Sequence, residues 1–260
     1  MKIGSLFSGI GGLELGLERA IPGAEVIWQA ERDPYCRDVL EKHWPKAKRY
    51  GDVRRIKGSE VERPDLLCGG FPCQGASSAG LGLGLEDHRT GLWIEFERLI
   101  GELDPRWVVL ENVAAIRTRG LSRVLYALAA CGYDALWDCI PAAAVGAPHL
   151  RDRWFCIGWR SPDAISDAVR VNLREQRERD REQRQEQRPS ELGDDGPGGA
   201  LAGHWRRALG QCSPWPVEPS VGRVADGVRD RAHRLRALGN AVVPQCAEVV
   251  GRMIAELEGL

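Results

Sequence analysis

The fold of this chain is decided by a stretch near its beginning, residues 2–20, which reads KIGSLFSGIGGLELGLERA. Ile3–Phe7 is apolar enough for a buried strand, and the glycine-rich turn Gly9–Gly12 follows it. Leu13 and Leu17 then recur at the spacing of one helix face. A glycine-rich turn between a strand and a helix is typical of nucleotide-binding α/β proteins, because glycine lets backbone amides approach a ligand closely. Alone it is a weak signal, since the spaced G-x-G-x-x-G pattern of dinucleotide enzymes is missing.

The alternation of strands and helices continues to about residue 160. Apolar and periodic segments predict further strands at 24–30, 65–68, 107–110, 133–140 and 153–159, and helices at 34–43, 92–103, 121–131 and 244–257. This βαβ alternation predicts an α/β fold with a doubly wound, mostly parallel sheet. In such sheets ligands bind at the carboxyl ends of the strands.

The composition fits a globular protein that acts inside the cell. A chain of 260 residues can form one α/β domain and a small accessory lobe. The net charge is -1, so a surface that binds nucleic acid must be a local concentration of arginine. The 8 cysteines form no CxxC pair, and we expect no metal site. Because we find no signal peptide and no apolar run of membrane-spanning length, we expect a cytoplasmic protein that contacts no membrane.

The character of the sequence changes at about residue 161. Residues 174–188 contain no apolar side chain, and residues 193–199 are rich in glycine. This composition is typical of a solvated helix or a disordered linker. An arginine-bearing arm that contacts phosphates is the alternative, which the acidic residues of the same segment weaken.

Reactive side chains follow several of the later strands. In Gly69-Gly70-Phe71-Pro72-Cys73 a cysteine stands in a loop, where nearby cations would favour the nucleophilic thiolate. Glu111 follows the strand at 107–110. Arg151 and Arg153 present two guanidinium groups that could bind a carboxylate, a phosphate or a base carbonyl. The carboxyl ends of strands meet at one edge, so Cys73 and Glu111 should face the same crevice.

Two acids and one amide could contact a nucleotide. Glu31 ends the second strand about 20 residues after the glycine turn, where an acid can bind ribose hydroxyls. Asp52 could accept a hydrogen bond from an adenine amino group, although an ordinary loop acid is an equal alternative. Asn240 leads into the last helix, and asparagine at a helix entrance is more often a cap than a ligand contact.

Five segments, in this order, resemble the DNA cytosine C5-methyltransferase family: Phe7–Gly12, Pro72-Cys73-Gln74, Glu111-Asn112-Val113, Arg151-Asp152-Arg153 and Gly239-Asn240-Ala241-Val242. They are similar to that family's first cofactor motif, nucleophile motif, acidic motif, Arg-x-Arg motif and carboxy-terminal motif. The chain departs from the family where Ser5 replaces a frequent aspartate and His149 a frequent glutamine. The segment between Arg160 and Val221 is also short for the family's target-recognition domain.

The resemblance implies a Rossmann-like S-adenosylmethionine-dependent fold, S-adenosylmethionine as cofactor and double-stranded DNA as substrate. It makes Cys73 the nucleophile at cytosine C6, places Glu111 at N3 and Arg153 at O2, and lets Arg151 position the base or the Cys73 loop. The implied cofactor-binding residues are Phe7, Ser8, Gly9, Ile10, Gly11, Gly12, Glu31, Arg32, Asp52, Val53, Pro72, Leu92, Asn240 and Val242.

The same resemblance suggests how the chain is divided. Residues 1–160 would form the catalytic domain, 161–220 a short target-recognition or linker region, and 221–260 a segment that completes the catalytic domain. Loop 77–89 resembles the family's mobile catalytic loop. A basic cluster before Asn240 is predicted to contact phosphates, with a solvated face as the alternative; it comprises Arg229, Arg231, Arg234 and Arg236. We expect a monomer that could act beside a restriction endonuclease.

Three other functions stay open from the sequence. An RNA methyltransferase that acts on tRNA could carry the same core motifs. A DNA- or cofactor-binding homologue with a degenerate site is disfavoured by the intact Cys73, Glu111 and Arg153. A nicotinamide-dependent enzyme is disfavoured by the missing dinucleotide pattern.

Overall fold

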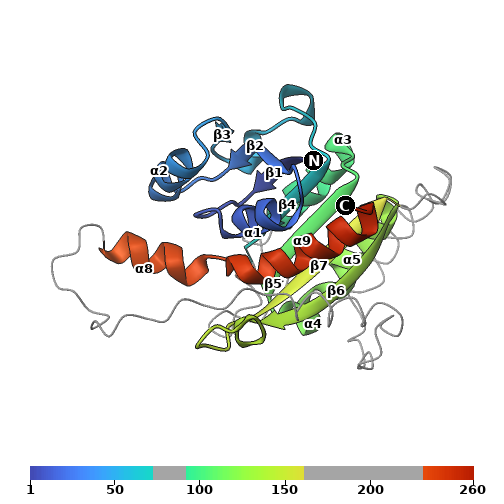
Figure 1. Cartoon of the computed structure of the whole chain (residues 1–260). Coiled ribbons are helices and arrows are strands. Elements are labelled where there is room, and N and C mark those ends of the chain that lie inside the picture. Colours follow the sequence, from blue (N-terminus) through green and yellow to red (C-terminus); the bar gives the residue numbers. More distant parts are fainter. Residues whose placement is uncertain (73–91, 161–230) are drawn as a thin grey trace, which may run out of the picture.

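The computed structural model describes residues 1–72, 92–160 and 231–260, which are coloured in Figure 1. Within these ranges a seven-stranded sheet has the order β3-β2-β1-β4-β5-β7-β6. The strands are β1 (Lys2–Leu6), β2 (Glu25–Ala30), β3 (Lys48–Tyr50), β4 (Leu66–Gly70), β5 (Trp107–Val113), β6 (Tyr133–Pro141) and β7 (Asp152–Arg160). Every strand predicted from the sequence is present, with ends shifted by at most three residues.

The sheet is mixed rather than wholly parallel. Neighbouring strands from β3 to β5 pair in parallel, whereas β7 pairs antiparallel with both β5 and β6. A parallel neighbour needs a long crossover connection, but an antiparallel one can follow after a short link. The link between β6 and β7 is such a short segment, which contains the 3-10 turn η5 (Ala142–Val145).

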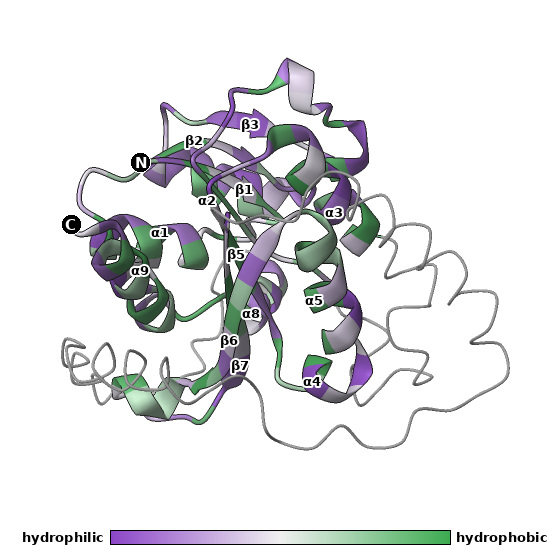
Figure 2. Ribbon diagram, turned by 90° about the vertical axis from the view of Figure 1, so that its right-hand side faces the viewer, coloured by the Kyte–Doolittle hydropathy of each residue, from purple (hydrophilic) through white to green (hydrophobic). Residues whose placement is uncertain are grey.

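Helices cover both faces of the sheet, which confirms the doubly wound α/β prediction. The helices are α1 (Gly12–Ala20), α2 (Pro34–His43), α3 (Leu92–Leu103), α4 (Ile116–Arg119), α5 (Leu121–Ala130), α8 (Arg231–Asn240) and α9 (Pro244–Glu258), with 3-10 turns η1 (Val53–Arg55) and η2 (Gly58–Glu60). Figure 2 shows α1 and α9 on one side and α3 and α5 on the other. Alternate residues of β5 serve the two cores: Trp107 and Val109 belong to one apolar cluster, and Val108 and Leu110 to the other.

The last helix packs closely on the first. A Cβ on Gly16 would lie 2.3 Å from the carbonyl oxygen of Pro244, and a Cβ on Gly251 would lie 2.6 Å from the Cβ of Ala20. Val249, Val250 and Ile254 of the apolar face predicted for α9 are buried in the same cluster as Leu13 and Leu17 of α1, whereas Leu257 is exposed. The carboxy-terminal segment therefore belongs to the same hydrophobic core as the first strand and helix.

Apart from the short helical turns α4, η1, η2 and η5, the sequence patterns did not predict β3 and α8. Strand β3 has only three residues, which lie at the sheet edge and carry no alternating apolar pattern. Helix α8 is polar on nearly every side, and among its described side chains only Ala237 is buried. Asn240 is the last residue of α8, and Val243 is the N-cap of α9. The interpretation of Asn240 as a cap of the last helix was wrong, because the chain between the two helices is extended.

Within residues 1–72, 92–160 and 231–260, no helix combines the length and the apolar character needed to cross a bilayer. The cysteines described there are free thiols, and Cys36, Cys68, Cys156 and Cys246 are buried. Burial raises the pKa of the Cys68 thiol well above its usual value, so this thiol stays protonated at neutral pH. These four residues act as small apolar side chains in the core.

Candidate active site at the switch point of the sheet

The strand order reverses between β1 and β4, whose carboxyl ends lie side by side. Leu6 pairs with Gly69 at this point. A Cβ on Gly69 would lie 2.2 Å from the carbonyl oxygen of Leu6, so only glycine lets the two strands approach this closely. The glycine turn follows β1, and Phe71 and Pro72 follow β4. The structure thus brings the first two motifs together at the position where doubly wound sheets bind ligands.

The turn after β1 has a left-handed backbone at three positions. The φ angle is 56° at Phe7, 56° at Gly9 and 85° at Gly11. A left-handed non-glycine residue is uncommon, and Phe7 is held there with its ring stacked on Phe96 at a centroid distance of 6.3 Å. Gly11 is also the N-cap of α1 and offers no side chain to the first amides of that helix. Such a turn lets a ligand approach the backbone closely, while the N–H groups of Ser8 and Gly11 donate to the carbonyl oxygens of Ala30 and Ser8.

Glu31 connects the end of β2 to this turn. Its Oε2 accepts a hydrogen bond from the backbone N–H of Gly9 at 2.8 Å, and its Oε1 accepts one from the N–H of Asp33 at 2.7 Å. A carboxylate has about four acceptor positions, so these two bonds orient the group and leave room for further donors. The arrangement suits the predicted contact with ribose hydroxyls.

A buried acid, Glu14 of α1, is connected to the turn through two serine hydroxyl groups. Ser5 donates from Oγ to Oε1 of Glu14 at 2.6 Å, and Ser8 donates to Oγ of Ser5 at 2.9 Å. Burial raises the pKa of Glu14 despite these hydrogen bonds. The strand residue that is often an aspartate in the family is Ser5 here, and the carboxyl group comes from α1 instead. Glu14 was not predicted from the sequence, where the signal was an acid at a helix position close to the apolar face.

The carboxy-terminal motif reaches the same turn. A Cβ on Gly12 would lie 2.2 Å from the carbonyl oxygen of Val242, so the two backbones are in close contact. Val242 is half-buried against the core cluster of α1 and α9, whereas Asn240 is exposed. Residues 230 positions apart in the sequence therefore meet beside the first motif, although only Val242 is packed there.

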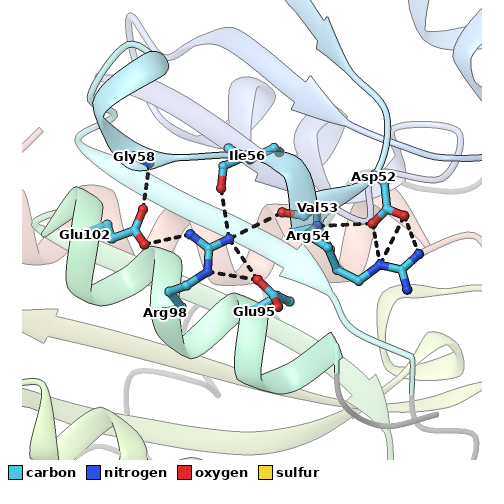
Figure 3. Close-up of polar contacts among 8 residues, drawn as sticks. All are labelled: Asp52, Val53, Arg54, Ile56, Gly58, Glu95, Arg98 and Glu102. Carbon is cyan, nitrogen blue, oxygen red and sulfur yellow. Dashed lines mark hydrogen bonds and ion pairs between the residues drawn. The ribbon is translucent and has the colours of Figure 1, made fainter. Parts of the chain in front are cut away.

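Several of the apolar residues expected at the cofactor lie together. Val53 is buried, and Phe7 and Leu92 pack against the same apolar cluster. Asp52 precedes Val53 and caps η1: its Oδ1 accepts from the N–H of Arg54 at 3.1 Å, and its carboxylate forms an ion pair with the Arg54 guanidinium (Figure 3). The side-chain hydrogen bond from Arg54 lowers the pKa of Asp52 to about 2, so Asp52 is ionised at any physiological pH.

Two further residues predicted to bind the cofactor, Arg32 and Pro72, are not buried. Arg32, next to Glu31, has an exposed side chain. Pro72 is half-buried at the end of the described part of its loop. Cys73, the predicted nucleophile, and loop 77–89 lie outside the described residues. Ser8, Gly9, Ile10 and Gly11 complete the turn described above.

The stem of the nucleophile loop is held by the acidic motif. Asn112 donates from Nδ2 to the carbonyl oxygen of Phe71 at 2.9 Å, two residues before Cys73. The ring of Phe71 packs against Trp93 with a centroid distance of 4.9 Å. Asn112 is buried, so this hydrogen bond is shielded from competition by water. No separate role of Asn112 was predicted from the sequence, and this tertiary contact supplies one.

Glu111 is the buried acid of the site. It pairs with Gly70 across β4 and β5, and a Cβ on Gly70 would lie 2.7 Å from its Oε2. Its Oε1 lies 3.1 Å from Nε of Arg153 on β7. Burial raises the pKa of Glu111 to about 7, while the positive charges of Arg153 and Arg151 oppose this shift. A carboxyl group with this pKa can both donate and accept a proton at neutral pH.

The two arginines of the Arg-x-Arg motif point to different partners. Arg153 faces Glu111, as the predicted site requires. Arg151 has a φ of 26° and donates from Nη2 to the carbonyl oxygens of Gly239 at 2.9 Å and Ala241 at 2.5 Å. Arg151 therefore holds the chain between α8 and α9, a contact between residues 88 and 90 positions apart that the sequence did not reveal.

The predicted phosphate-binding cluster is only partly described. Arg236 pairs with Asp33, Nη2 to Oδ2 at 2.7 Å, so it joins α8 to the start of α2. Arg234 is exposed. Arg229 and the side chain of Arg231 lie outside the described residues. Arg236 thus has an intramolecular partner that the sequence analysis did not foresee.

Comparison with known proteins identifies the fold and the family. Solved structures with the same fold include a prophage-encoded E. coli protein named as a DNA modification methyltransferase, with a TM-score of 0.63, 20% identity and coverage of 100% of both chains. A mutant of Spodoptera frugiperda DNMT2 gives a TM-score of 0.53 and 20% identity, over 64% of this chain and 51% of that one. The sheet is that of the S-adenosylmethionine-dependent methyltransferase fold.

The sequence model of the C-5 cytosine-specific DNA methylases matches residues 1–195, and the chain belongs to this family. Curated relatives include the type II methyltransferase M.NgoBI of Neisseria gonorrhoeae, 35% identical over 59% of this chain and 49% of that protein. M.NgoPII of the same species is 36% identical over 62% of this chain and 48% of its own length. The chain spans about half the length of the curated relatives it matches.

Proposed function

We propose that this chain transfers a methyl group from S-adenosylmethionine to C5 of cytosine in double-stranded DNA. The observation that carries the proposal is Glu111, a buried carboxyl group with a pKa of about 7 that lies 3.1 Å from Arg153 beside the nucleophile loop. An acid that is half protonated at neutral pH suits proton exchange with a ring nitrogen. Family membership and the named relatives support the same reaction.

The residues at the carboxyl ends of β1 and β2 fit S-adenosylmethionine. The left-handed turn at Phe7–Gly11 lets a ligand approach the backbone closely, and Glu31, which accepts from the Gly9 N–H, keeps free acceptor positions beside it. Val53 and Leu92 supply an apolar surface of the kind that an adenine ring packs against. When bound there, S-adenosylmethionine supplies an electrophilic methyl group on a sulfonium.

Cys73 and Glu111 would share the activation of the base. The Cys73 thiolate adds to C6, and the electron pair of the C5–C6 double bond moves through the ring toward N3, which takes the proton of Glu111. C5 then has the electron density to attack the methyl group, and the N3 proton returns to Glu111. A base would then take the C5 proton, and the C–H electron pair would reform the C5–C6 double bond as the Cys73 sulfur leaves as thiolate, which restores the aromatic ring.

The other residues of the site would hold this geometry. Arg153 would donate to the O2 atom of the base while its Nε keeps the Glu111 carboxylate in place. Asn112 fixes the carbonyl of Phe71, and with it the direction in which the Cys73 loop leaves β4. Because C5 is stacked inside a duplex, the target base must be flipped out, at a cost of a few kcal/mol.

Residues 161–220, outside the described ranges, are proposed as a reduced target-recognition region between catalytic segments 1–160 and 221–260. The packing of α9 on α1 supports the assignment of the last segment to the catalytic domain. Deletion of residues 174–188 should change the methylated sequence context without changing the binding of S-adenosylmethionine. An unchanged context after this deletion contradicts a recognition role for that stretch.

Bisulfite sequencing of DNA from a bacterial host that expresses the protein tests the reaction directly. New 5-methylcytosine in a defined context is expected, and none with the Cys73→Ser variant. Purified protein should also methylate duplex DNA in preference to tRNA. Soluble wild-type protein that leaves the host DNA unmodified, or that modifies only tRNA, overturns the proposed function.

A further inference from the structure

Arg98 projects from α3 onto the backbone of the η1 segment (Figure 3). Its Nη2 donates to the carbonyl oxygen of Ile56 at 2.9 Å and lies 3.5 Å from that of Val53. On its own helix, Nε donates to Glu95 at 2.8 Å and Nη1 donates to Glu102 at 2.7 Å. All three guanidinium nitrogens are therefore engaged, and the two carboxylates fix the plane of the group.

Glu102 extends the same connection to η2. Its Oε2 accepts from the backbone N–H of Gly58 at 2.7 Å. A Cβ on Gly58 would lie 2.7 Å from the Cβ of Glu102, so glycine is needed for this approach. Burial alone would raise the pKa of Glu102, but the hydrogen bonds from Arg98 and Gly58 outweigh it and lower the pKa. Glu102 thus stays ionised and holds Arg98 and η2 together.

The segment that Arg98 holds begins with the residues predicted to bind adenine. Arg98 contacts the carbonyl of Val53 itself and that of Ile56, Asp52 directly precedes Val53, and Arg54 orients the Asp52 carboxylate. Val53 and Ile56 are also buried against the apolar side chains of α3. Apolar contacts have no direction and allow small shifts of the backbone, whereas hydrogen bonds to two carbonyls fix its position.

We propose that Arg98 is a positioning residue that sets the adenine end of the cofactor site. It fixes the backbone at Val53 relative to α3, so that the Asp52 carboxylate meets the 6-amino group of adenine at hydrogen-bonding distance. Nothing in the sequence pattern marked Arg98, because a charged residue on the polar side of a helix is ordinarily a solvated one. The inference rests on the proposed use of S-adenosylmethionine and deepens it.

Arg63 provides a matched control, because it contacts the carboxyl end of the same helix. Its Nε donates to the carbonyl oxygen of Leu103 at 2.6 Å, and its Nη2 pairs with Asp104 at 3.0 Å. Arg63 thus makes the same kinds of contact with α3 as Arg98 does. Arg63 lies just before the amino end of β4, so its contacts do not involve Asp52 or Val53. Loss of Arg63 should weaken the packing of α3 without moving Asp52 or Val53.

The test compares two ligands by titration calorimetry: S-adenosylhomocysteine and S-inosylhomocysteine, which replaces the 6-amino donor with a carbonyl. Wild-type protein should prefer the adenine ligand, because the carbonyl faces the ionised Asp52. For Arg98→Ala the Kd of S-adenosylhomocysteine should rise about tenfold, and the preference between the ligands should fall toward one. Arg63→Ala should keep the wild-type preference even if its Tm falls equally. Arg98→Lys, which can donate to one carbonyl, should lie between.

The outcomes separate this inference from the proposed function. If wild-type protein binds neither ligand, the proposed cofactor is wrong. If wild-type protein shows the preference and both Arg98→Ala and Arg98→Lys retain it, Arg98 only stabilises the fold and the inference is overturned. Should Arg98→Ala fail to fold, Arg98→Lys decides alone. In steady-state assays Arg98→Lys should raise the KM for S-adenosylmethionine and leave kcat and the KM for DNA unchanged.

Discussion

The two sides of the candidate site are held in place by different kinds of interaction. On the β1–β2 side, backbone geometry dominates: left-handed residues, glycines and amides that meet Glu31. On the β4–β5–β7 side, the key groups are buried side chains, above all Glu111 and Arg153. The first side therefore depends on backbone conformation, and the second depends on the burial of its ionisable side chains. Substitutions should therefore affect binding and stability on the first side, and proton transfer on the second.

The largest effect is expected from Glu111→Gln. The amide keeps the shape of the side chain but cannot give a proton to N3, so kcat should fall about 10²–10⁴-fold. Calorimetric affinity for S-adenosylhomocysteine should not change, because Glu111 belongs to the other side of the candidate site. A variant that keeps most of its kcat would show that the buried acid takes no part in the reaction.

The stability of the protein should depend on pH through Glu111. Unfolding returns the pKa of this group from about 7 to 4.5, so the folded state binds more protons between these values. The stabilisation present below about pH 4.5 is lost as pH rises through about 7, by up to about 3 kcal/mol. In urea unfolding, the unfolding free energy of Glu111→Gln should therefore rise relative to that of wild type as the pH is raised from about 5 to about 8. A pH-independent difference between the two proteins contradicts the shifted pKa.

Two glycine substitutions sharpen the contrast between the sides. In Gly12→Ala the new Cβ would lie 2.2 Å from the backbone carbonyl of Val242, which cannot move without shifting α9. Unfolding free energy should fall by about 1–3 kcal/mol or more. In Gly70→Ala the Cβ meets the end of the Glu111 side chain instead, at 2.7 Å. This variant should lose kcat with little loss of stability, since the carboxylate can turn away. Equal stability losses in the two variants would contradict the comparison.

The smallest effect is expected from Glu31→Gln. The amide can still accept from the Gly9 N–H, but it loses the charge that strengthens its bonds to ribose hydroxyls. The Kd of S-adenosylhomocysteine should rise about tenfold, and kcat at saturating cofactor should change little. The matched control is Glu18→Gln. The Glu18 carboxylate also accepts from a backbone N–H, that of Val26, but it does so at the amino end of β2, away from the candidate site. A loss of kcat without a change in Kd would place Glu31 in the chemistry instead.

The predictable part of the fold came from local patterns. Apolar strands such as that at 107–110 and helices such as those at 34–43 and 92–103 follow from side-chain periodicity, and α2 and α3 have the predicted bounds. Helix α8 escaped prediction because its sequence has no apolar face. The sequence pointed to Glu31 and Glu111 because each follows an apolar strand pattern, where an acid has access to the ligand side of the sheet, and to Arg153 because it belongs to an Arg-x-Arg pair.

The order of the motifs along the chain follows from the sequence alone, and it sets which groups lie near the ends of the strands. The contacts between these groups are visible only in the folded molecule. Arg151 binds the α8–α9 linker, Glu14 replaces the acid missing at Ser5, and Arg98 holds the segment that carries Val53. These partners depend on how strands register and helices pack over long sequence distances. No local pattern encodes them, because the same arginine or glutamate on a solvated helix face would look identical in the sequence.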